Sequence, residues 1–571
     1  MTAKYKEGSV IKDLISKAVA KVGFNCENVE VTRPDIAFGD YSTNVALKLA
    51  PQVKQSPLKI AEAIVEQLKK DKAIKSATVA GPGFINVAMA DDWLDHQLNL
   101  PLNVAPTLQD KKYIIEFSSP NIAKPMHVGH LRTTILGQVL VNLFRSAGAN
   151  MVAWSHPGDF GTQFGKLIVG WLKWGEDKAL QDHPIDELLR VYVKFHQEAK
   201  DDPKLEDQAR QTFKKLQDGD KEVVALWQMV SRLSHEEFDR MYDKLKIKFD
   251  VWRGESEYNH LLAQFVDDAL EVKVACKSEG AIIIPLDEQN LPPFLIQKSD
   301  GATLYATSDL VSLKERADEV NPDELIYVVG NEQTLHFQQL FAAAEKLAEA
   351  GVYGAGFELP KLTHVSYGFF RLKTGKMSTR QGDVIRLDEV IDAAVQKCDE
   401  LLLAKNDKLT KKDREELAQT LGLAAVKYTD LQHDRHTDVV FDWDKMFALE
   451  GNSIIYLIYA YARCNSLLIK STSTNAGDGN EVGWSEDDKQ LLFTSLELNH
   501  AVRQSIEEYD PHHLINHVYE VASQFSRLYS HNAILNASAE DRARRLKLVA
   551  MVKAQLQLLF DLLNIDAPEK L

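Results

Sequence analysis

The chain has 571 residues, 45% of them hydrophobic and 26% charged, so it is long enough for several domains, each with its own core. Its formal net charge of −16 excludes a surface that is basic throughout and binds nucleic acid indiscriminately, although a local basic groove stays open. The four cysteines lie far apart without a C-x-x-C pair, which argues against a disulfide framework and against a structural zinc site.

No segment is typical of a membrane anchor. The longest apolar run, residues 453–462, is too short to cross a bilayer, and the N-terminal stretch MTAKYKEGSVIKDLIS carries charges where a signal peptide needs apolar residues. We therefore expect a cytoplasmic protein with no membrane partner.

Residues 1–110 are predicted to form a small α+β domain. Two helical patterns, SVIKDLISKAVAKVG and SPLKIAEAIVEQLKK, precede the strand-like stretch SATVAGPGFINVAM, which is interrupted at Gly81, Pro82 and Gly83. A linker rich in proline and asparagine then closes this domain.

Residues 111–390 are predicted to form a doubly wound α/β domain. The strand KYIIEF, a tight turn and a helix with apolar residues at helical spacing open it. The charged, helical pattern of about residues 171–290 indicates an insertion. The stretches AIIIPL, ATLYATSDL, ELIYVVG and LTHVSYGFF are then interpreted as strands with which the second half of the sheet resumes. From residue 391 onward the pattern is helical, and it ends in a strongly amphipathic helix.

Two histidines mark the turn between the first strand and helix of this α/β domain. Gly129 between His127 and His130 lets a ligand approach the backbone, and the following helix offers N–H groups and the positive end of its dipole to phosphate oxygens. By itself this pattern is also compatible with buried core histidines, and less readily with zinc, because no third ligand stands at a recognisable spacing.

A cationic loop follows far downstream, in RLKTGKMSTRQGDVIRL. Lys376, Met377 and Ser378 lie between glycines, where a lysine and a hydroxyl can follow the charge that develops on pyrophosphate. An isolated K-M-S is more often a solvated loop. The presence of both motifs on one chain, each at the edge of the same predicted sheet, favours a phosphate-binding role for both.

This pair of motifs resembles the signature motifs of class I aminoacyl-tRNA synthetases, and the sequence around them is similar to that of the arginyl-tRNA synthetase family. The segments that carry the resemblance occur in order: SSPNIAKPMHVGHLRTT, HPGDFGTQFGKL, LYATSDL, YVVGNEQTLHFQQLF, KMSTRQGD and KYTDLQHDRHTDVVFDW. The resemblance covers the whole chain. It implies a Rossmann-type catalytic sheet with a helical insertion, an N-terminal domain that binds the tRNA D-loop, a connecting helical region at 391–450 that contacts the tRNA stem, and an α-helical anticodon-binding bundle at 451–571.

The resemblance implies an arginine–tRNA ligase. Such an enzyme joins L-arginine to ATP, brought with Mg²⁺, forms arginyl-adenylate and pyrophosphate, and transfers arginine to the terminal ribose of tRNA-Arg. In-line attack on the α-phosphate needs no catalytic base, so the rate comes from positioning and charge neutralisation. The family further implies a monomer.

The family's site residues transfer onto matching positions of this chain. His127, Gly129, His130, Lys376, Met377 and Ser378 are expected at ATP, and Glu116, Ser119, Asn121, His127, Tyr305, Asp309 and Gln333 at arginine. A guanidinium needs a carboxylate and further acceptors in matching geometry. The class pattern has a second loop lysine where this chain has Thr379. In arginyl enzymes that loss accompanies a lysine just before the histidines, matched here by Lys124, and Arg380 is a further candidate for the same role.

Five positions match the family's tRNA contacts. They are Phe84 and Asn86 for the D-loop, and Tyr456, Tyr459 and Tyr529 for the anticodon, where aromatic rings stack on single-stranded bases. Judged by the residues alone, a strand phenylalanine or a tyrosine on an apolar helix is more often core. The basic cluster RARRLK at residues 542–547 suits either phosphates or a solvated helix face.

Two alternatives remain open at this point. One is another nucleotidyltransferase with the His-x-Gly-His motif, which would leave the long helical C-terminal half without a purpose. The other is a catalytically idle RNA-binding paralogue, against which the two intact motifs and the complete set of pocket residues argue.

Overall fold

The computed structural model describes residues 10–26, 29–34, 38–372, 385–405, 409–473, 475–477 and 483–568. The chain divides into two compact units, which are described separately. Unit 1 comprises Met1–Ala105, Leu449–Asp561 and Asp566–Leu571, and unit 2 comprises Pro106–Ala448 and Leu562–Ile565. None of the helices in the described ranges is both long and apolar enough to span a bilayer.

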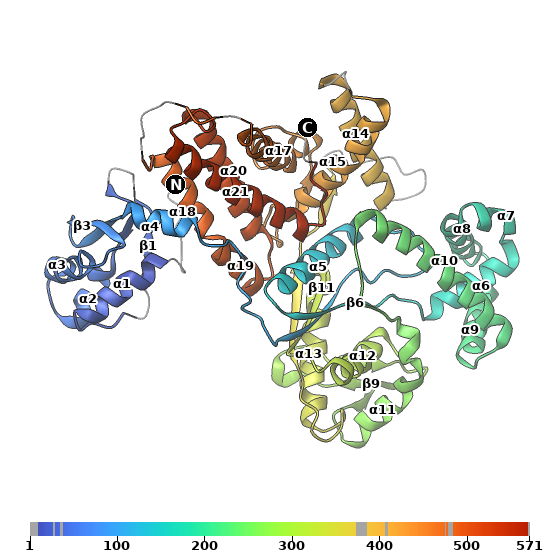
Figure 1. The fold of residues 1–571 in the computed structure, drawn as a ribbon. Coiled ribbons are helices and arrows are strands. Elements are labelled where there is room, and N and C mark those ends of the chain that lie inside the picture. The colour runs from blue at the N-terminus through green and yellow to red at the C-terminus, as the bar shows by residue number, and fades with distance from the viewer. Residues whose placement is uncertain are drawn as a thin grey trace. The chain divides into compact units, whose positions relative to one another are not determined.

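A five-stranded parallel sheet forms the centre of unit 2 (Figure 1). Its strands are β5 (Lys112–Glu116), β6 (Asn150–Ser155), β7 (Val251–Trp252), β11 (Glu324–Gly330) and β12 (Lys361–Tyr367), in the order β12-β11-β5-β6-β7. The chain starts at β5, builds outward to β6 and β7, and returns to add β11 and β12 on the other side. The predicted doubly wound, Rossmann-type sheet is therefore confirmed, with its switch point between β5 and β11.

Helices cover this sheet because its strands are apolar on both faces, as buried parallel strands require. Helix α5 (Val128–Ser146) packs against β5, β6 and β11, and α13 (Thr334–Glu349) packs against β12. Helix α12 (Tyr305–Val320) contacts α13 and α11 (Leu262–Glu271).

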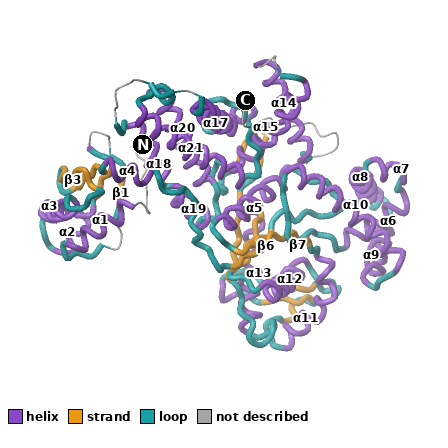
Figure 2. Tube along the Cα trace, viewed as in Figure 1, coloured by secondary structure: helices purple, strands orange, loops and turns teal. Residues whose placement is uncertain are grey.

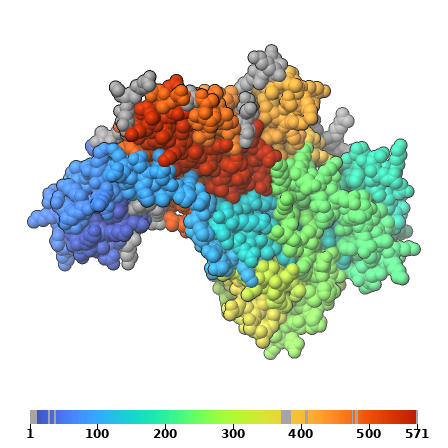
Figure 3. Space-filling view, in the orientation of Figure 1, coloured from blue at the N-terminus to red at the C-terminus, as the bar shows by residue number. Residues whose placement is uncertain are grey.

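Helices α6 to α10 form the helical insertion, visible as a separate group in Figure 1 and as a teal to green lobe in Figure 3. They are α6 (Thr162–Trp174), α7 (Asp177–Asp182), α8 (Pro184–Glu198), α9 (Lys204–Gln217) and α10 (Lys221–Leu245). Amphipathic spacing in α8 and α9 buries one face of each against α6.

Two strand predictions in this unit are corrected by the structure. The stretch AIIIPL does form a strand, β9 (Ala281–Ile284), but in a separate antiparallel sheet with β8 (Cys276–Ser278) and β10 (Phe294–Gln297). The stretch ATLYATSDL is largely the first turn of α12, because its apolar residues pack as a helix face against η2 (Glu255–Leu261) and β10. The parallel sheet resumes only at β11.

The remaining elements of unit 2 lie outside the parallel sheet. They are α14 (Leu387–Lys405), α15 (Lys411–Leu431), α16 (Trp443–Met446), the short 3₁₀ helices η3 (Asp287–Gln289) and η4 (Asn331–Gln333), and the paired strands β13 (Phe370–Leu372) and β14 (Val439–Phe441).

The N-terminal part of unit 1 is the predicted small α+β domain. Strands β1 (Val31–Thr32), β2 (Tyr41–Thr43), β3 (Ile74–Ala80) and β4 (Phe84–Met89) form an antiparallel sheet in the order β1-β2-β4-β3, which appears as a separate orange cluster in Figure 2. Helices α1 (Val10–Lys21), α2 (Val45–Val53), α3 (Pro57–Leu68) and α4 (Asp91–Leu98) accompany it.

The C-terminal part of unit 1 is helical, as predicted. It contains α17 (Ile454–Ser471), α18 (Glu486–Leu496), α19 (Leu498–Glu507), α20 (His512–His531) and α21 (Ala539–Leu562). Buried residues recur at helical spacing along α21, and they include the polar Gln555.

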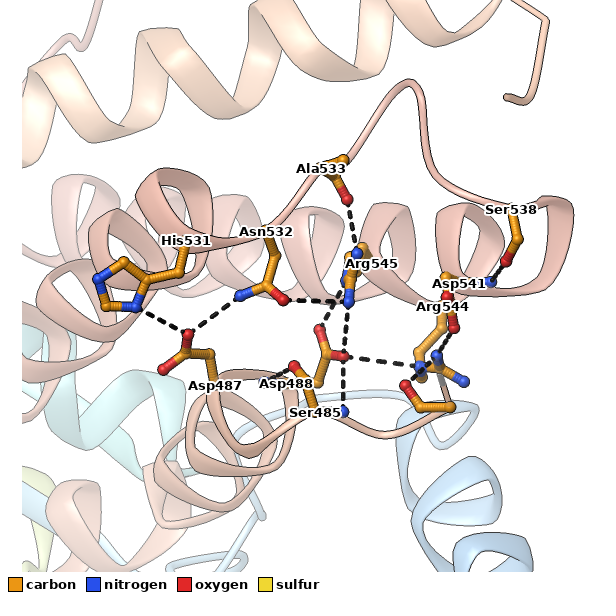
Figure 4. Close-up of polar contacts among 11 residues, drawn as sticks. Ser485, Asp487, Asp488, His531, Asn532, Ala533, Ser538, Asp541, Arg544 and Arg545 are labelled. Atoms are coloured by element: carbon orange, nitrogen blue, oxygen red, sulfur yellow. Dashed lines mark hydrogen bonds and ion pairs between the residues drawn. The ribbon is translucent and has the colours of Figure 1, made fainter. Parts of the chain in front are cut away.

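An ion-pair network joins these C-terminal helices (Figure 4). Asp488, near the start of α18, is fully buried and accepts a hydrogen bond from Nε of Arg545 at 3.1 Å. Arg545 also donates to the carbonyl of Ala533 at 2.6 Å, and Arg544 pairs with Asp541. For Arg544 and Arg545, the sequence-based interpretations as phosphate contacts or as a solvated helix face are therefore both wrong. Carboxylates inside the bundle neutralise these two arginines.

Candidate active site

A cavity of about 1500 Å³ opens at the carboxyl ends of the parallel strands. Residues that follow β5 and β11 line it, and so do the first turn of α12, η2 and one face of α9. Open α/β sheets bind their ligands at this place, outside the switch point of the strand order. The volume exceeds the roughly 300–1000 Å³ of most small-molecule pockets, so there is space for more than one ligand.

The segment that leads from β5 into the cavity is held in a constrained conformation. Ser118 and Ala123 have positive φ angles of 47° and 63°, which residues with a Cβ rarely adopt. The hydroxyl of Ser118 lies 3.0 Å from that of Tyr242, and the amide of Ala123 donates to Ser234 at 2.9 Å. Both partners belong to α10, so a helix of the insertion stabilises the strained segment.

His127 caps the start of helix α5, His130 lies in its first turn, and both side chains accept hydrogen bonds from backbone amides of this turn. Nδ1 of His127 accepts from the amide of Gly129, Nδ1 of His130 accepts from the amide of His127, and both distances are 3.1 Å. The two rings lie 3.8 Å apart. A Cβ at position 129 would lie 2.8 Å from the His127 ring, which explains the glycine. The chain thus uses two imidazoles as a reciprocal helix cap.

Both imidazoles are uncharged at neutral pH. Burial and the neighbouring His127 lower the pKa of His130 to about 3, and burial together with Lys124 lowers the pKa of His127. Since each Nδ1 accepts a hydrogen bond, each Nε2 carries the remaining proton. The pair can therefore donate two hydrogen bonds to phosphate oxygens without adding charge.

The expectation that the start of α5 offers its own N–H groups is wrong in this structure. The amide of Val128 donates to Ile385 at 2.9 Å, and that of Gly129 to His127. The imidazoles therefore take over the donor role that the sequence assigned in part to the backbone.

Carboxylates also line the cavity. Glu116 ends β5 and pairs with Arg316, and Asp309 accepts from Nε2 of His336 at 2.8 Å. Glu255, at the start of η2, was missed by the sequence interpretation, because nothing local to it signals a pocket. Burial, followed by the charges of Asp309, Asp159 and Glu116, raises its pKa to about 8. Excess negative charge in a partly desolvated cavity favours a cationic ligand.

The other predicted arginine contacts line the same cavity. Ser119, Asn121, Tyr305 and Gln333 all line the cavity. The hydroxyl of Ser119 accepts from the amide of His156 at 3.0 Å, and Asn121 forms a backbone bridge with Gly158. The ring of Tyr305 is 59% exposed and lies 5.1 Å from that of His336. The structure thus brings together every predicted arginine contact.

Lys124 stands apart from this group. It does not line the cavity, and its Nζ lies over the ring of Tyr192 in α8, 5.6 Å from the centroid. Its charge still reaches the turn, since it contributes to the lowered pKa of His127.

The predicted loop residues Lys376, Met377, Ser378, Thr379 and Arg380 lie outside the described residues. The chain that follows them returns to the histidine turn. Leu387 donates to the carbonyl of Met126 at 3.0 Å, and Arg386 forms a backbone bridge with His127.

The predicted tRNA contacts in unit 1 differ in exposure. Phe84 is exposed at the start of β4, whereas Asn86 is buried within that strand. Tyr456 is half-buried, and its hydroxyl lies 2.9 Å from that of Ser526.

Tyr459 and Tyr529 are 48% and 42% exposed. They share one cation, because the guanidinium of Arg463 lies 4.8 Å from the first ring centroid and 4.6 Å from the second. The sequence interpretation missed Arg463, although it stands one helical turn after Tyr459 in α17.

Comparison with known proteins agrees with this architecture. Residues 98–443 match the family described as tRNA synthetases class I (R), catalytic domain. Residues 9–89 match the arginyl tRNA synthetase N terminal domain, and residues 457–571 match the DALR anticodon binding domain. The sequence is 36% identical to the arginine–tRNA ligase of Fusobacterium nucleatum, over 98% of this chain and 99% of that protein.

The chain belongs to the arginyl-tRNA synthetase family.

Further comparisons agree with this membership. The arginine–tRNA ligase of Clostridium acetobutylicum is 40% identical over 81% of each chain. The arginyl-tRNA synthetase of Plasmodium falciparum has the same fold, with a TM-score of 0.79 at 26% identity over 98% of both chains. That of Thermus thermophilus superposes with a TM-score of 0.78 over 98% of this chain and 99% of its own, at 23% identity. The family resemblance seen in the sequence is confirmed.

Proposed function

We propose that this chain is an arginine–tRNA ligase, which joins arginine to ATP, releases pyrophosphate and then esterifies arginine to the 3′-terminal ribose of tRNA-Arg. The observation that carries the proposal is the composition of one cavity. Its wall combines two neutral imidazole donors with a group of carboxylates, at the switch point of a Rossmann-type sheet. The full-length similarity to arginine–tRNA ligases supports the same activity.

The imidazoles suit the triphosphate. Nε2–H groups of His127 and His130 donate to its oxygens, and Gly129 leaves space beside them for the nucleotide. Lys376 and Ser378 of the loop, with Met377, are proposed to neutralise the departing pyrophosphate, aided by Mg²⁺ that enters with ATP. Lys124, whose charge reaches the histidine turn, is proposed to take the role that the class gives to the missing second loop lysine, with Arg380 as a further candidate.

The carboxylates suit the side chain of arginine. Glu116, Asp309 and Glu255 supply acceptors for its guanidinium, and Tyr305 covers it from the exposed side of the cavity. Ser119, Asn121, His127 and Gln333 are proposed to contact the backbone groups and fix the substrate carboxylate near the α-phosphate. A lysine side chain would leave part of these acceptors unpaired, which opposes its activation.

Different residues of unit 1 are proposed to contact two regions of the tRNA, the D-loop and the anticodon. Phe84, with Asn86, is proposed to contact the D-loop, and Tyr456, Tyr459 and Tyr529 to contact the anticodon. An aromatic pair around a cation, as at Arg463, is a suitable platform for unpaired bases. We propose that the domains act within one monomer in the cytoplasm, with residues 391–450 at the tRNA stem.

Exchange of labelled pyrophosphate into ATP tests the first step of the proposal. The folded protein is assayed with each of the twenty amino acids, with and without total tRNA. Exchange with arginine alone is expected. No exchange under either condition would favour a catalytically idle RNA-binding paralogue. Exchange with another amino acid would refute the assignment of the pocket to arginine.

A further inference from the structure

A buried arginine of the protein itself, Arg316, lies behind the proposed arginine pocket. Arg316 lies two turns beyond Asp309 on the same face of α12, about 10 Å deeper along the helix. Its side chain is fully buried, and it lies behind the cavity wall and not on it. One of its terminal nitrogens, Nη1, donates to Oε2 of Glu116, the first of the proposed guanidinium acceptors.

This contact is the main polar interaction of the Arg316 side chain. Neither Nε nor Nη2 has a hydrogen-bond partner among the residues that the structure describes. The guanidinium otherwise lies 5.1 Å from the ring centroid of Trp154, where the π-face offsets part of the loss of water. Burial by itself would lower the pKa of Arg316, but Glu116 and two tyrosines outweigh it and raise that pKa, so the cation persists.

A buried ion pair is weak evidence for stability, since removing two charges from water opposes most of their attraction. Its position directly behind a substrate-binding carboxylate suggests a different purpose. Without Arg316, Glu116 would face Asp309 and Glu255 with no compensating charge and with no donor to fix the orientation of its carboxylate.

We infer that Arg316 is a positioning residue for arginine recognition, which engages Oε2 of Glu116 so that Oε1 faces the substrate. Ser119 supports this orientation from the other side, with its hydroxyl 3.5 Å from Oε1. Glu116 then accepts from two guanidinium groups, one of the protein and one of the substrate. The inference rests on the proposed function, because it assumes that arginine occupies this pocket.

A double-mutant cycle tests the inference with the full chain, ATP and tRNA-Arg. Arginine KM, ATP KM and kcat for charging are measured for the wild type, Arg316→Met, Glu116→Gln and the double variant. Arg316→Met is expected to raise the arginine KM on the order of thirtyfold and to leave the ATP KM within about twofold. In the Glu116→Gln background the same change should alter the arginine KM by less than about twofold.

Arg253→Met is the matched control. Arg253 lies at the same distance from the Trp154 ring, 5.1 Å, but it pairs with Glu319 and does not contact Glu116. Its loss should leave the arginine KM unchanged. Arg316→Lys, which keeps the charge, should recover part of the affinity. If Arg316→Met does not fold, the same cycle is run with Arg316→Lys. Its smaller rise in arginine KM should likewise disappear in the Glu116→Gln background.

Equal effects of Arg316→Met in both backgrounds would overturn the inference, and so would equal losses of ATP and arginine affinity. An unchanged arginine KM in a normally active Arg316→Met would do the same. A wild-type protein that fails to charge tRNA with arginine would instead refute the proposed function itself.

Discussion

Arginine binding should release a proton, because Glu255 has to ionise when a guanidinium reaches it. Burial and the surrounding carboxylates raise the pKa of Glu255 to about 8, above its ordinary value of 4.5. In the empty pocket at pH 7 this group is therefore protonated in about nine of ten molecules. The arriving cation supplies the charge that the ionised form lacks.

The size of the effect on arginine affinity follows from the pKa of Glu255. Ionising Glu255 at pH 7 requires about 1.4 kcal/mol, which weakens the apparent affinity for arginine about tenfold relative to a pH well above 8. The sign is fixed by the direction of the shift: affinity rises with pH through the window from 7 to 9. The histidines do not contribute there, because the pKa values of His127 and His130 are lowered, not raised.

Titration calorimetry in buffers of different ionisation enthalpy measures the effect. We expect about 0.9 proton released per arginine bound to the wild type at pH 7. In Glu255→Gln the release should disappear, the affinity should lose its pH dependence, and ATP binding should stay the same. Arginine binding to the wild type without proton release would refute the reasoning, because Glu255 would then be ionised already or distant from the substrate.

Four further outcomes are expected. Asp309→Ala should raise the arginine KM by the equivalent of about 2 to 5 kcal/mol in steady-state charging, because the buried guanidinium loses its acceptor; an unchanged KM would remove Asp309 from the pocket. His130→Ala should lower kcat by about 10²-fold in single-turnover kinetics, since an electrostatic donor is lost, and normal turnover would undo its phosphate role. Asp488→Ala should destabilise the C-terminal bundle by about 3 to 5 kcal/mol in denaturant unfolding, because Arg545 is left buried and unpaired; a wild-type midpoint would contradict the network of Figure 4. Tyr459→Ala should raise the KM for tRNA and leave pyrophosphate exchange with arginine unaltered, whereas equal losses in both assays would argue against a tRNA contact.

Elements with a strong local pattern were predictable. The opening of the catalytic domain joins a short apolar strand to a long helix through a glycine-bearing turn, and the structure has β5 and α5 there. The arginine-pocket residues that match the family also line a single cavity. In both cases the determining signal lies within a few neighbouring residues.

Features that depend on contacts between distant segments were not predictable. Tyr305 opens a helix and not a strand, because its neighbours pack against η2 and β10, some fifty and ten residues away in the chain. The role of Glu255 results from its burial near Asp309 and Glu116, and that of Arg316 from a partner two hundred residues earlier. No local periodicity encodes such pairs, so one sequence by itself does not reveal them.

Charging of total tRNA with each of the twenty labelled amino acids tests the central claim most directly. The account predicts that arginine alone becomes esterified to tRNA, in an ATP-dependent reaction, on the tRNA-Arg fraction. Esterification of a different amino acid, or none by folded protein supplied with ATP, Mg²⁺ and tRNA, would contradict it.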